Sequence, residues 1–567
     1  MKHVRIAALL AALWLQPGSA ETPTGDQLFL HGDIKTPTGW VEAMAVRDGA
    51  IIALGDESAV RAAAAPSAEI IELKGATVMP GLHDSHVHPL FAGLEQFQCR
   101  LAPAAAPDVI QAAVRACAAS SAPGDWVMGG NWVAAAFQTG QQNRAFLDTA
   151  APVNPVVLND EAHHSVWVNS AALAAAGITR DTPNPEGGII EREANGEPNG
   201  LLREAATRLV EAVVPPATLA LRRRALLLST QQMLAYGITS FTIASVRQPD
   251  IDPLSALSRE GLIPQRMRGC LVWDPTPAAL REAEEALIAR RTEYATPRFQ
   301  TDCVKVFLDG VPTESHTGAM LAPYADLHAN GQDLRPTRGL LLVPQPELNG
   351  VVTVLDRLGL SVKFHAAGDA AVRAAIDAVA AAHHSNGLGG PLHAVGHSTF
   401  VDAADIPRVQ ANAMAWEFSP YIWYPNPMVS MDVTAAVGDA RMRRWMPVRE
   451  AVETNALVVA GSDWSVVPSV NPWLGMETMV TRQRPGGSTE TIGDEEAVNL
   501  DTAFTLFTLN AARLEGQADH LGSLELGKRA DFVVTQQNPW KMAITSLHAI
   551  TVQMTFIDGK RVYDATH

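Results

Sequence analysis

Histidine and aspartate residues follow several apolar, strand-like segments of this 567-residue chain. His86 and His88 come shortly after the run ATVMPGL. His365 follows LSVKF, His397 follows LHAVG and Asp463 follows ALVVAGS. Imidazoles and carboxylates are common ligands of divalent cations. Residues i and i+2 of a strand point the same way, so His86 and His88 can bind one cation together. The pattern predicts a metal site assembled from several strands.

The stretch PGLHDSHVHPL at residues 80–90 holds a third histidine, His83, with the opposite strand parity. It comes directly after the Pro80-Gly81 break, so we interpret it as a turn residue or as a residue behind the ligands. Asp84 shares the parity of His86 and His88 but lies deeper, where it could orient an imidazole. Only two of the three histidines are therefore predicted to bind metal.

The elements that must position these side chains alternate between strand and helix. Apolar runs of strand length, followed by helical stretches rich in Ala, Leu and Arg, include GITSFTIAS, QRMRGCLVW, CVKVFLDG, LSVKFHAAGD, LHAVGHSTF, AMAWEFSP and ALVVAGSDW. This alternation predicts a parallel α/β architecture, most simply a (β/α)₈ barrel. The carboxyl ends of parallel barrel strands open on one face, so the ligand-type residues are expected to meet there.

Both chain ends look different from this central part. Residues 26–79 and the C-terminal runs LGSLELGKRADFVVT and VQMTFIDGKRVYD show short strands separated by Gly and Asp turns. The two ends are expected to form one composite β domain. The predicted division is a leader at 1–20, the N-terminal part of the β domain at 21–79, a barrel at 80–512 and the C-terminal part of the β domain at 513–567.

The first twenty residues have the order of a secretory signal. A basic start (MKHVR) precedes the apolar stretch IAALLAALWL and the small residues GSA, which predicts cleavage after about Ala20. The apolar stretch is too short to span a bilayer. The expected location is the periplasm or the medium.

The chain has four cysteines, and an oxidising compartment would let them pair. Cys99 and Cys117 flank an expected helix, which makes a local disulfide plausible. Cys270 and Cys303 lie in strand-like segments and either pair with each other or remain buried thiols. The formal net charge of −17 repels phosphate backbones, so nucleic-acid binding is not expected.

Taken together, the motifs resemble a known family. PGLHDSHVHP is similar to the PGxxDxHxH opening of the metal-dependent amidohydrolase superfamily, and VKVFLDG, HAAGD, GHS, GSDWSV and GSLELGKRADFVV follow in that superfamily's order. The set most resembles amidohydrolase family 3, the YtcJ-like branch that includes N-substituted formamide deformylases. The segments 159–178 and 200–206 also resemble that branch. The resemblance implies a distorted (β/α)₈ barrel with a composite β-sandwich and a centre of one or two metal ions, usually zinc.

The resemblance also implies a ligand set. His86, His88 and Asp463 would bind the first ion, and His365 and His397 the second. Lys305 would bridge two ions as a carbamate, because an ammonium cannot bind a cation whereas a carbamate is an anionic oxygen ligand. The alternative is that Lys305 neutralises an acid such as Asp309. Other candidate ligands are Lys363, Cys99 and Glu204; a disulfide to Cys117 would exclude Cys99. Two Zn²⁺ ions are favoured over one.

The implied reaction is attack of a metal-activated hydroxide on a carbonyl group. Asp463 would move the proton from water to the leaving nitrogen, and His316 or His164 would polarise the carbonyl. The residues expected to contact substrate are Trp132, His164, Trp167, Asn169, Glu204 and Tyr324. For the aromatic residues Trp132, Trp167 and Tyr324 the alternative is plain packing, and for Glu204 it is a helix-surface acid.

The sequence predicts an exported hydrolase of an amide or formamide-type C–N bond. One alternative keeps the site but changes the electrophile to an ester, a lactone or a ring that is deaminated. Another is a non-catalytic periplasmic protein that binds a ligand or metal on a decayed hydrolase scaffold. The expected partner is a small-molecule substrate, with no nucleic acid, no membrane span, and a homodimer as one option for assembly.

Overall fold

The computed structural model describes residues 25–102, 105–138, 140–160, 164–275, 277–313, 316–325, 328–329, 332–333, 337–419 and 421–566. The leader predicted at residues 1–20 lies outside these ranges. Within them, no helix has the length and apolar character needed to cross a membrane.

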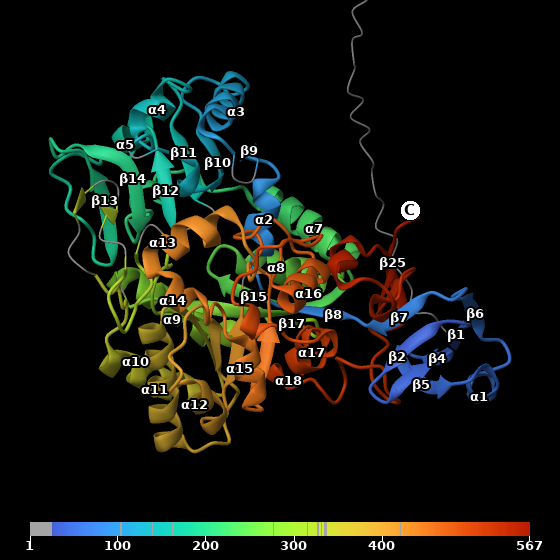
Figure 1. Cartoon of the computed structure of the whole chain (residues 1–567). Coiled ribbons are helices and arrows are strands. Elements are labelled where there is room, and N and C mark those ends of the chain that lie inside the picture. The colour runs from blue at the N-terminus through green and yellow to red at the C-terminus, as the bar shows by residue number, and fades with distance from the viewer. Residues whose placement is uncertain are drawn as a thin grey trace, which may run out of the picture.

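Eight parallel strands form a barrel at the centre of the molecule (Figure 1). In order around the sheet they are β8 (Leu82–Val87), β15 (Ile238–Val246), β16 (Arg266–Trp273), β17 (Phe299–Phe307), β20 (Ser361–Ala366), β21 (Ala394–His397), β22 (Ala415–Phe418) and β23 (Leu457–Ala460). Their order along the sheet follows the order of the chain, which confirms the predicted (β/α)₈ barrel.

The first and last strands are joined beyond their carboxyl ends. The backbone N–H of Asp463 donates to the carbonyl of His86 at 2.7 Å, and that of His88 donates to the carbonyl of Trp464 at 2.7 Å. The Asp84 carboxylate accepts from the backbone N–H and the hydroxyl of Ser462 at 2.9 and 2.5 Å. Asp84 therefore ties the two strands together, a different role from orienting an imidazole.

Helices surround the barrel and bury their apolar faces on it. Alanine-rich α11 (Asp369–Asn386) buries Val372, Ile376 and Val379, which lie on one helical face. In α2 (Pro89–Glu95) Pro89 occupies the first turn, where a missing N–H is tolerated, so His88 stands at the strand-to-helix junction. The other main helices are α7 (Leu219–Ala235), α8 (Ile251–Arg259), α9 (Ala278–Ala289), α10 (Gln345–Arg357), α12 (Ile406–Ala411), α15 (Val448–Glu453), α16 (Pro472–Thr481), α17 (Leu500–Leu506) and α18 (Leu509–Leu514).

A second sheet, here called the insert, interrupts the barrel between β8 and β15. Its strands are β9 (Cys99–Arg100), β10 (Val127–Trp132), β11 (Val156–Asp160), β12 (Ser165–Val168), β13 (Gly188–Arg192) and β14 (Pro198–Glu204), in the spatial order β13-β14-β12-β11-β10-β9. Helices α3 (Pro107–Ala119), α4 (Arg144–Asp148) and α5 (Ser170–Ala175) belong to it. Residues 80–512 are predicted as one barrel, and within that range residues 99–204 contain this separate sheet.

Strands from both chain ends pair in one six-stranded sheet, in the order β26-β25-β24-β7-β2-β3. β7 (Thr77–Pro80) runs antiparallel to β24 (Phe532–Thr535). The other strands of this sheet are β2 (Asp33–Thr36), β3 (Gly39–Val41), β25 (Val552–Ile557) and β26 (Lys560–Asp564). A four-stranded sheet of β1 (Gln27–Leu30), β4 (Ala43–Arg47), β5 (Ala50–Gly55) and β6 (Glu69–Glu72) lies against it. The ring of Phe29 packs edge-on against Phe532 between the sheets, with centroids 5.0 Å apart.

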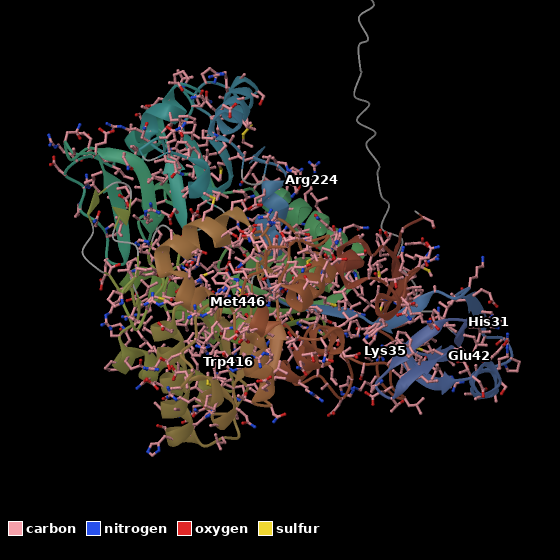
Figure 2. All side chains as sticks on the ribbon, viewed as in Figure 1. His31, Lys35, Glu42, Arg224, Trp416 and Met446 are labelled. Carbon is pink, nitrogen blue, oxygen red and sulfur yellow. A yellow bond between two sulfur atoms is a disulfide. The ribbon has the colours of Figure 1, made fainter. Side chains whose placement is uncertain are left out.

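Figure 2 shows His31, Lys35 and Glu42 on this β domain, while Trp416 and Met446 lie in the body of the molecule. All four cysteines are bonded in pairs. Cys99 bonds to Cys117, and Cys270 bonds to Cys303 across the neighbouring strands β16 and β17.

Candidate metal centre

Three ligand-type side chains converge at the barrel mouth. Nitrogen and oxygen atoms of His86, His397 and Asp463 lie within 4.8 Å of one another, and all three residues are buried. The Asp463 carboxylate lies 3.5 Å from His86 Nε2 and 3.5 Å from His397 Nδ1. His88 adds its Nε2 at 3.2 Å from the same carboxylate. The ring of His365 completes the group, with its centroid 4.2 Å from that of His397.

The backbone of two of these residues adopts an uncommon conformation. His397 and Asp463 have φ angles of +66° and +59°, in the left-handed region that non-glycine residues rarely enter. Such strain is often found where a functional side chain has to be aimed. Here it follows a strand end in each case, at the turn that brings the side chain over the barrel.

Sequence reasoning missed the group that holds His86. Glu417, on β22 and fully buried, lies with Oε1 2.6 Å from His86 Nδ1. A carboxylate only accepts, so Nδ1 carries the ring proton and Nε2 is left for a ligand. Lys363 pairs with the other oxygen of Glu417 and donates to the Ser85 carbonyl at 2.8 Å. Lys363 is thus a counter-ion and does not bridge ions.

His365 is held in the same way from below. Its Nδ1 donates to Asp309 Oδ1 at 3.0 Å. The Asp309 carboxylate also accepts from the backbone N–H groups of Ala319, Ala367 and Gly368 at 2.8–3.0 Å. Asp309, the alternative partner predicted for Lys305, is therefore already hydrogen-bonded to other groups.

Burial sets the charge of these ligands. It lowers the pKa of His86, His365 and His397 well below the usual range, because the neutral ring loses less solvation than the cation. Burial, followed by repulsion from Lys363, lowers the pKa of Lys305 to about 7. Neutral imidazoles keep the lone pairs that a cation needs.

These residues fit a metal ion. His397 Nε2 is buried and has no hydrogen-bond partner among the described residues, which is costly unless another group satisfies it. His86 Nε2 is freed by the bond from Nδ1 to Glu417. A divalent cation beside the Asp463 carboxylate would satisfy His86 Nε2, and His397 Nε2 is open to the same or to a second cation. The donor set of imidazole nitrogens and carboxylate oxygen suits zinc.

A cationic imidazole stands beside the centre. His164 lies with Nδ1 2.9 Å from Glu204 Oε2, and the other oxygen of Glu204 accepts from the Thr317 hydroxyl at 2.5 Å. Burial alone would lower the pKa of His164, but the charge and hydrogen bond of Glu204 outweigh it and raise the pKa to about 9. The rings of His164 and His365 have centroids 5.1 Å apart.

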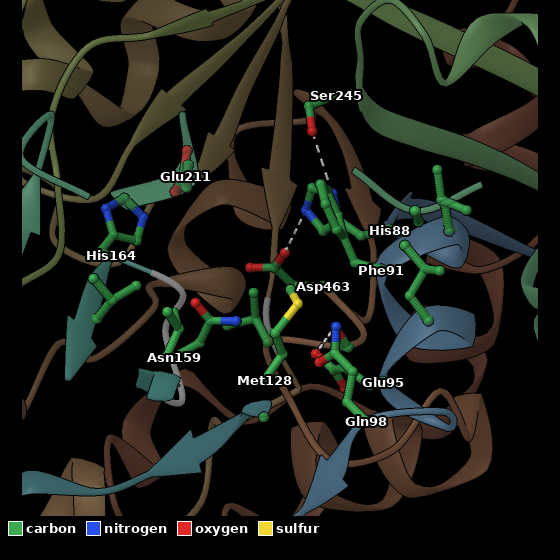
Figure 3. A pocket seen from close by; sticks show the side chains of 18 of the residues that line it. His88, Phe91, Glu95, Gln98, Met128, Asn159, His164, Glu211, Ser245 and Asp463 are labelled. Atoms are coloured by element: carbon green, nitrogen blue, oxygen red, sulfur yellow. Dashed lines mark hydrogen bonds and ion pairs between the residues drawn. The ribbon is translucent and has the colours of Figure 1, made fainter. Parts of the chain in front are cut away.

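A cavity of about 1060 Å³ opens above these residues (Figure 3). It is lined by all six predicted metal ligands and by His164; Figure 3 shows the bonds from Asp463 to His88 and from His88 to Ser245. The walls come from the insert, from α2, from residues 211–222 and from loops of the barrel. This volume accommodates a drug-sized molecule.

Three residues predicted to contact substrate lie elsewhere. Trp132 and Trp167 are buried in the core of the insert, where their ring nitrogens donate to the carbonyls of Leu158 and Asn143. Trp167 pairs with Leu158 in the sheet, so both point to the face opposite the cavity. Asn169 caps α5 and has all its polar atoms bonded within the insert. The structure thus places these three residues in the packing of the insert and not on the cavity wall, which is the alternative given for the two tryptophans.

His316 and Tyr324 also lie off the cavity wall. Their rings stack with centroids 4.7 Å apart, and the Tyr324 hydroxyl donates to the Gly318 carbonyl at 2.7 Å. Neither side chain is among the residues that line the cavity. Of the two histidines proposed to polarise a carbonyl, His164 is the one that the structure places at the site.

A second group of ligand-type residues lies away from the mouth. Atoms of Asp356, His383 and His393 are within 4.8 Å of one another. The backbone N–H of Val362 donates to His393 Nδ1 at 3.0 Å, so the ring proton sits on Nε2 and points to Asp356 at 3.2 Å. A protonated nitrogen has no lone pair for a cation. This group ties α10 to the starts of β20 and β21.

A (β/α)₈ barrel with imidazole and carboxylate ligands at the carboxyl ends of its strands is the arrangement of a metal-dependent hydrolase. The chain belongs to the amidohydrolase family, whose model matches residues 69–563. The predicted family is thereby confirmed, and the protein is a hydrolase that acts on carbon–nitrogen bonds.

Known relatives span nearly the whole chain. YtcJ of Bacillus subtilis (strain 168) is 28% identical over 534 residues, covering 92% of this chain and 96% of YtcJ. The N-substituted formamide deformylase of Arthrobacter pascens is 26% identical over 556 residues, covering 96% and 99%. An uncharacterized metal-dependent hydrolase from Pyrococcus furiosus has the same fold, with a TM-score of 0.68, 22% identity and coverage of 91% of this chain and 100% of its own.

Proposed function

We propose that this protein uses zinc to hydrolyse an amide or formamide-type bond of a small molecule. The observation that carries the proposal is the convergence of neutral, buried imidazoles and Asp463 on one cavity, with His397 Nε2 left without a partner. The formamide deformylase from Arthrobacter pascens supports the choice of bond.

The side chains around the cavity divide the work of the reaction. His86, His88, His365, His397 and Asp463 would hold the zinc, which would supply an acidified water and a positive charge near the carbonyl oxygen. Asp463 takes the proton of the attacking water and gives it to the leaving nitrogen. His164, fixed by Glu204, donates a hydrogen bond to the carbonyl oxygen and stabilises the negative charge that forms there. Water and amide thus become a carboxylic acid and an amine.

We further propose two ions bridged by a carboxylated Lys305. Lys305 is buried on β17 and lines the cavity together with His365 and His397. Carboxylation needs a neutral amine, which the lowered pKa of Lys305 provides. The carbamate would replace an ammonium that repels cations with an anionic ligand.

The test combines elemental analysis with hydrolysis assays on N-formyl, N-acyl and aryl amides. We expect two zinc ions per chain, loss of turnover on chelation and recovery on adding zinc. Asp463→Asn should lower kcat by at least about 1000-fold while keeping the metal, since an amide oxygen still binds zinc but cannot carry the proton. Lys305→Ala should lose both ions.

Several results would count against this assignment. Wild-type-like turnover in Asp463→Asn would remove that residue from proton transfer, and one ion unaffected by Lys305→Ala would mean a mononuclear site. A metal-replete protein that hydrolyses no acyl substrate would favour the binding-protein alternative.

We also propose that the chain is exported. The N-terminal composition supports this, and so do the two disulfides, since such bonds persist mainly in oxidising compartments. Mass spectrometry of the chain from a periplasmic fraction should give a mature form that begins after about Ala20.

A further inference from the structure

One face of the insert forms the roof of the cavity. Met128 of β10 and Val157 of β11 are register partners, as are Asn159 of β11 and Val166 of β12. Side chains two apart on a strand share a face, so these residues look the same way, and all of them line the cavity. Figure 3 shows Met128 and Asn159 extending toward the space around Asp463. Of these four side chains Asn159 alone is polar, and His164, two residues before Val166, borders them on the side of the metal centre.

The walls next to the roof are apolar as well. Leu90, Phe91 and Leu94 of α2 line one side. Val214 and Leu221 line another, from the segment that leads into α7. Phe91 is 46% exposed even though it borders the cavity, so apolar surface continues to the opening. A substrate group that fills this space would therefore gain from burying hydrocarbon.

Among the described lining residues, the arginines and the cationic His164 are each already paired with an acid, His164 at the metal centre with Glu204. Away from the metal centre, the cations among the described lining residues are Arg222 and Arg247. Arg222 pairs with Asp250. Arg247 pairs with Asp274 at 2.7 Å and with Glu284 at 2.8 Å. The other charged residues in the lining away from the metal centre are the acids Glu95 and Glu211, which repel an anion.

From this distribution we propose that the substrate is an amide that carries an extended apolar group and no carboxylate, with the apolar group under the roof of the insert. The inference rests on the proposed function and names its substrate class. N-acyl amino acids and peptides with a free carboxyl end near the scissile bond are disfavoured, because their carboxylate would be desolvated without a partner. Hydrolysis consumes one water and releases a carboxylic acid and an apolar amine, or the apolar acid and a small amine.

The experiment compares matched substrates with the zinc-replete wild-type enzyme. N-acetylphenethylamine and N-acetylphenylalanine differ only by a carboxylate. We expect kcat/KM of the wild-type enzyme to be about 100-fold higher for N-acetylphenethylamine. The association constant, measured by calorimetry with the Asp463→Asn variant, should favour the same compound by about 100-fold. A series from N-acetylethylamine to N-acetylhexylamine should gain roughly three-fold in kcat/KM for each added methylene.

One variant and its control test whether the roof determines the preference between the two substrates. Met128→Arg introduces a cation into the lining and should shift the ratio of the two kcat/KM values toward N-acetylphenylalanine by at least about ten-fold. The same substitution at Met431, which is 56% exposed and outside the lining, is the control and should leave the ratio unchanged.

The outcomes separate the two proposals. Preference for N-acetylphenylalanine, no gain with chain length, or failure of both compounds to bind would overturn the substrate class. Binding with the expected preference but without hydrolysis by wild-type enzyme would uphold the class and refute the proposed function.

Discussion

Glu417 determines which nitrogen of His86 faces the cavity. Glu417→Gln can present an amide N–H to Nδ1 and leaves the Lys363 ammonium buried without its counter-ion. We expect metal affinity to fall by about 10-fold to 100-fold, as is usual when the partner of a ligating histidine is lost. Competition with a chromogenic chelator measures the affinity.

The double variant Glu417→Gln/Lys363→Met is the matched control, because it removes the unpaired charge. It should regain thermal stability but not metal affinity. If the single variant bound zinc as tightly as the wild-type enzyme, Glu417 would have no role in orienting His86.

The sequence predicted the ligands better than their supports. His86, His365, His397 and Asp463 are recognisable because each follows an apolar strand, and strand ends of a barrel meet. Glu417 and Asp309 are recognisable only once the register between distant strands is known. The sole local signal for Glu417 was an acid inside the apolar run AMAWEF. The choice between substrate contact and packing for Trp132 and Trp167 depends on which face of the insert adjoins the cavity, and the sequence does not give that face.

At the scale of elements, the close approach of α2 and α7 constrains the helix that follows His88. A Cβ on Gly93 would lie 2.1 Å from the backbone oxygen of Ala225. We expect Gly93→Ala to lower the free energy of unfolding by about 1–3 kcal/mol, because the helices would have to separate. Gly350→Ala is the control: this glycine lies in α10 with nothing within 4 Å, so alanine should stabilise by about 0.5–1 kcal/mol.

Denaturant titrations of both variants check the comparison. Equal changes in the free energy of unfolding for the two variants would show that α2 and α7 can separate without loss of stability.

The separate sheet of the insert could not be predicted from the sequence. Its short strands have the apolar content of barrel strands, and only their pairing into a separate sheet distinguishes them.

At the scale of the whole molecule, buried histidines make the fold sensitive to acid. Burial lowers the pKa of His393 to about 4, and its bond to Asp356 only partly opposes this. Below its usual pKa of about 6.5 the unfolded chain takes up a proton that the folded chain refuses until about pH 4. The free energy of unfolding should therefore fall as the pH drops from 6.5 to 4, by up to about 3 kcal/mol for this group.

Urea titrations at pH 7, 5.5 and 4.5 test this dependence. His393→Gln should be less stable at pH 7 and lose less stability on acidification than the wild-type protein. Parallel loss in both proteins would assign the acid sensitivity to other groups.

Two arginines, Arg266 and Arg298, link the barrel to the β domain, and Arg529 joins the same acids from within that domain. Arg266 at the start of β16 pairs with Asp531 at 2.8 Å and with Asp558 at 2.7 Å, and Arg298 and Arg529 also pair with Asp558. The composite β domain was predictable because both chain ends carry strand patterns. The ion pairs were not predictable, because Arg266 and Arg298 lie more than two hundred residues away from their acids in the sequence.

The backbone bonds that join β8 to the loop after β23 also bear on the timing of metal capture. His86 and His88 are synthesised early, but Asp463 reaches them only when the last barrel strand has closed on the first. A chain that ends before Asp463 holds the four histidines without the carboxylate that lies between them. The candidate site is therefore complete only after the last barrel strand has been made, so a truncation before residue 457 removes the site together with the closure of the barrel.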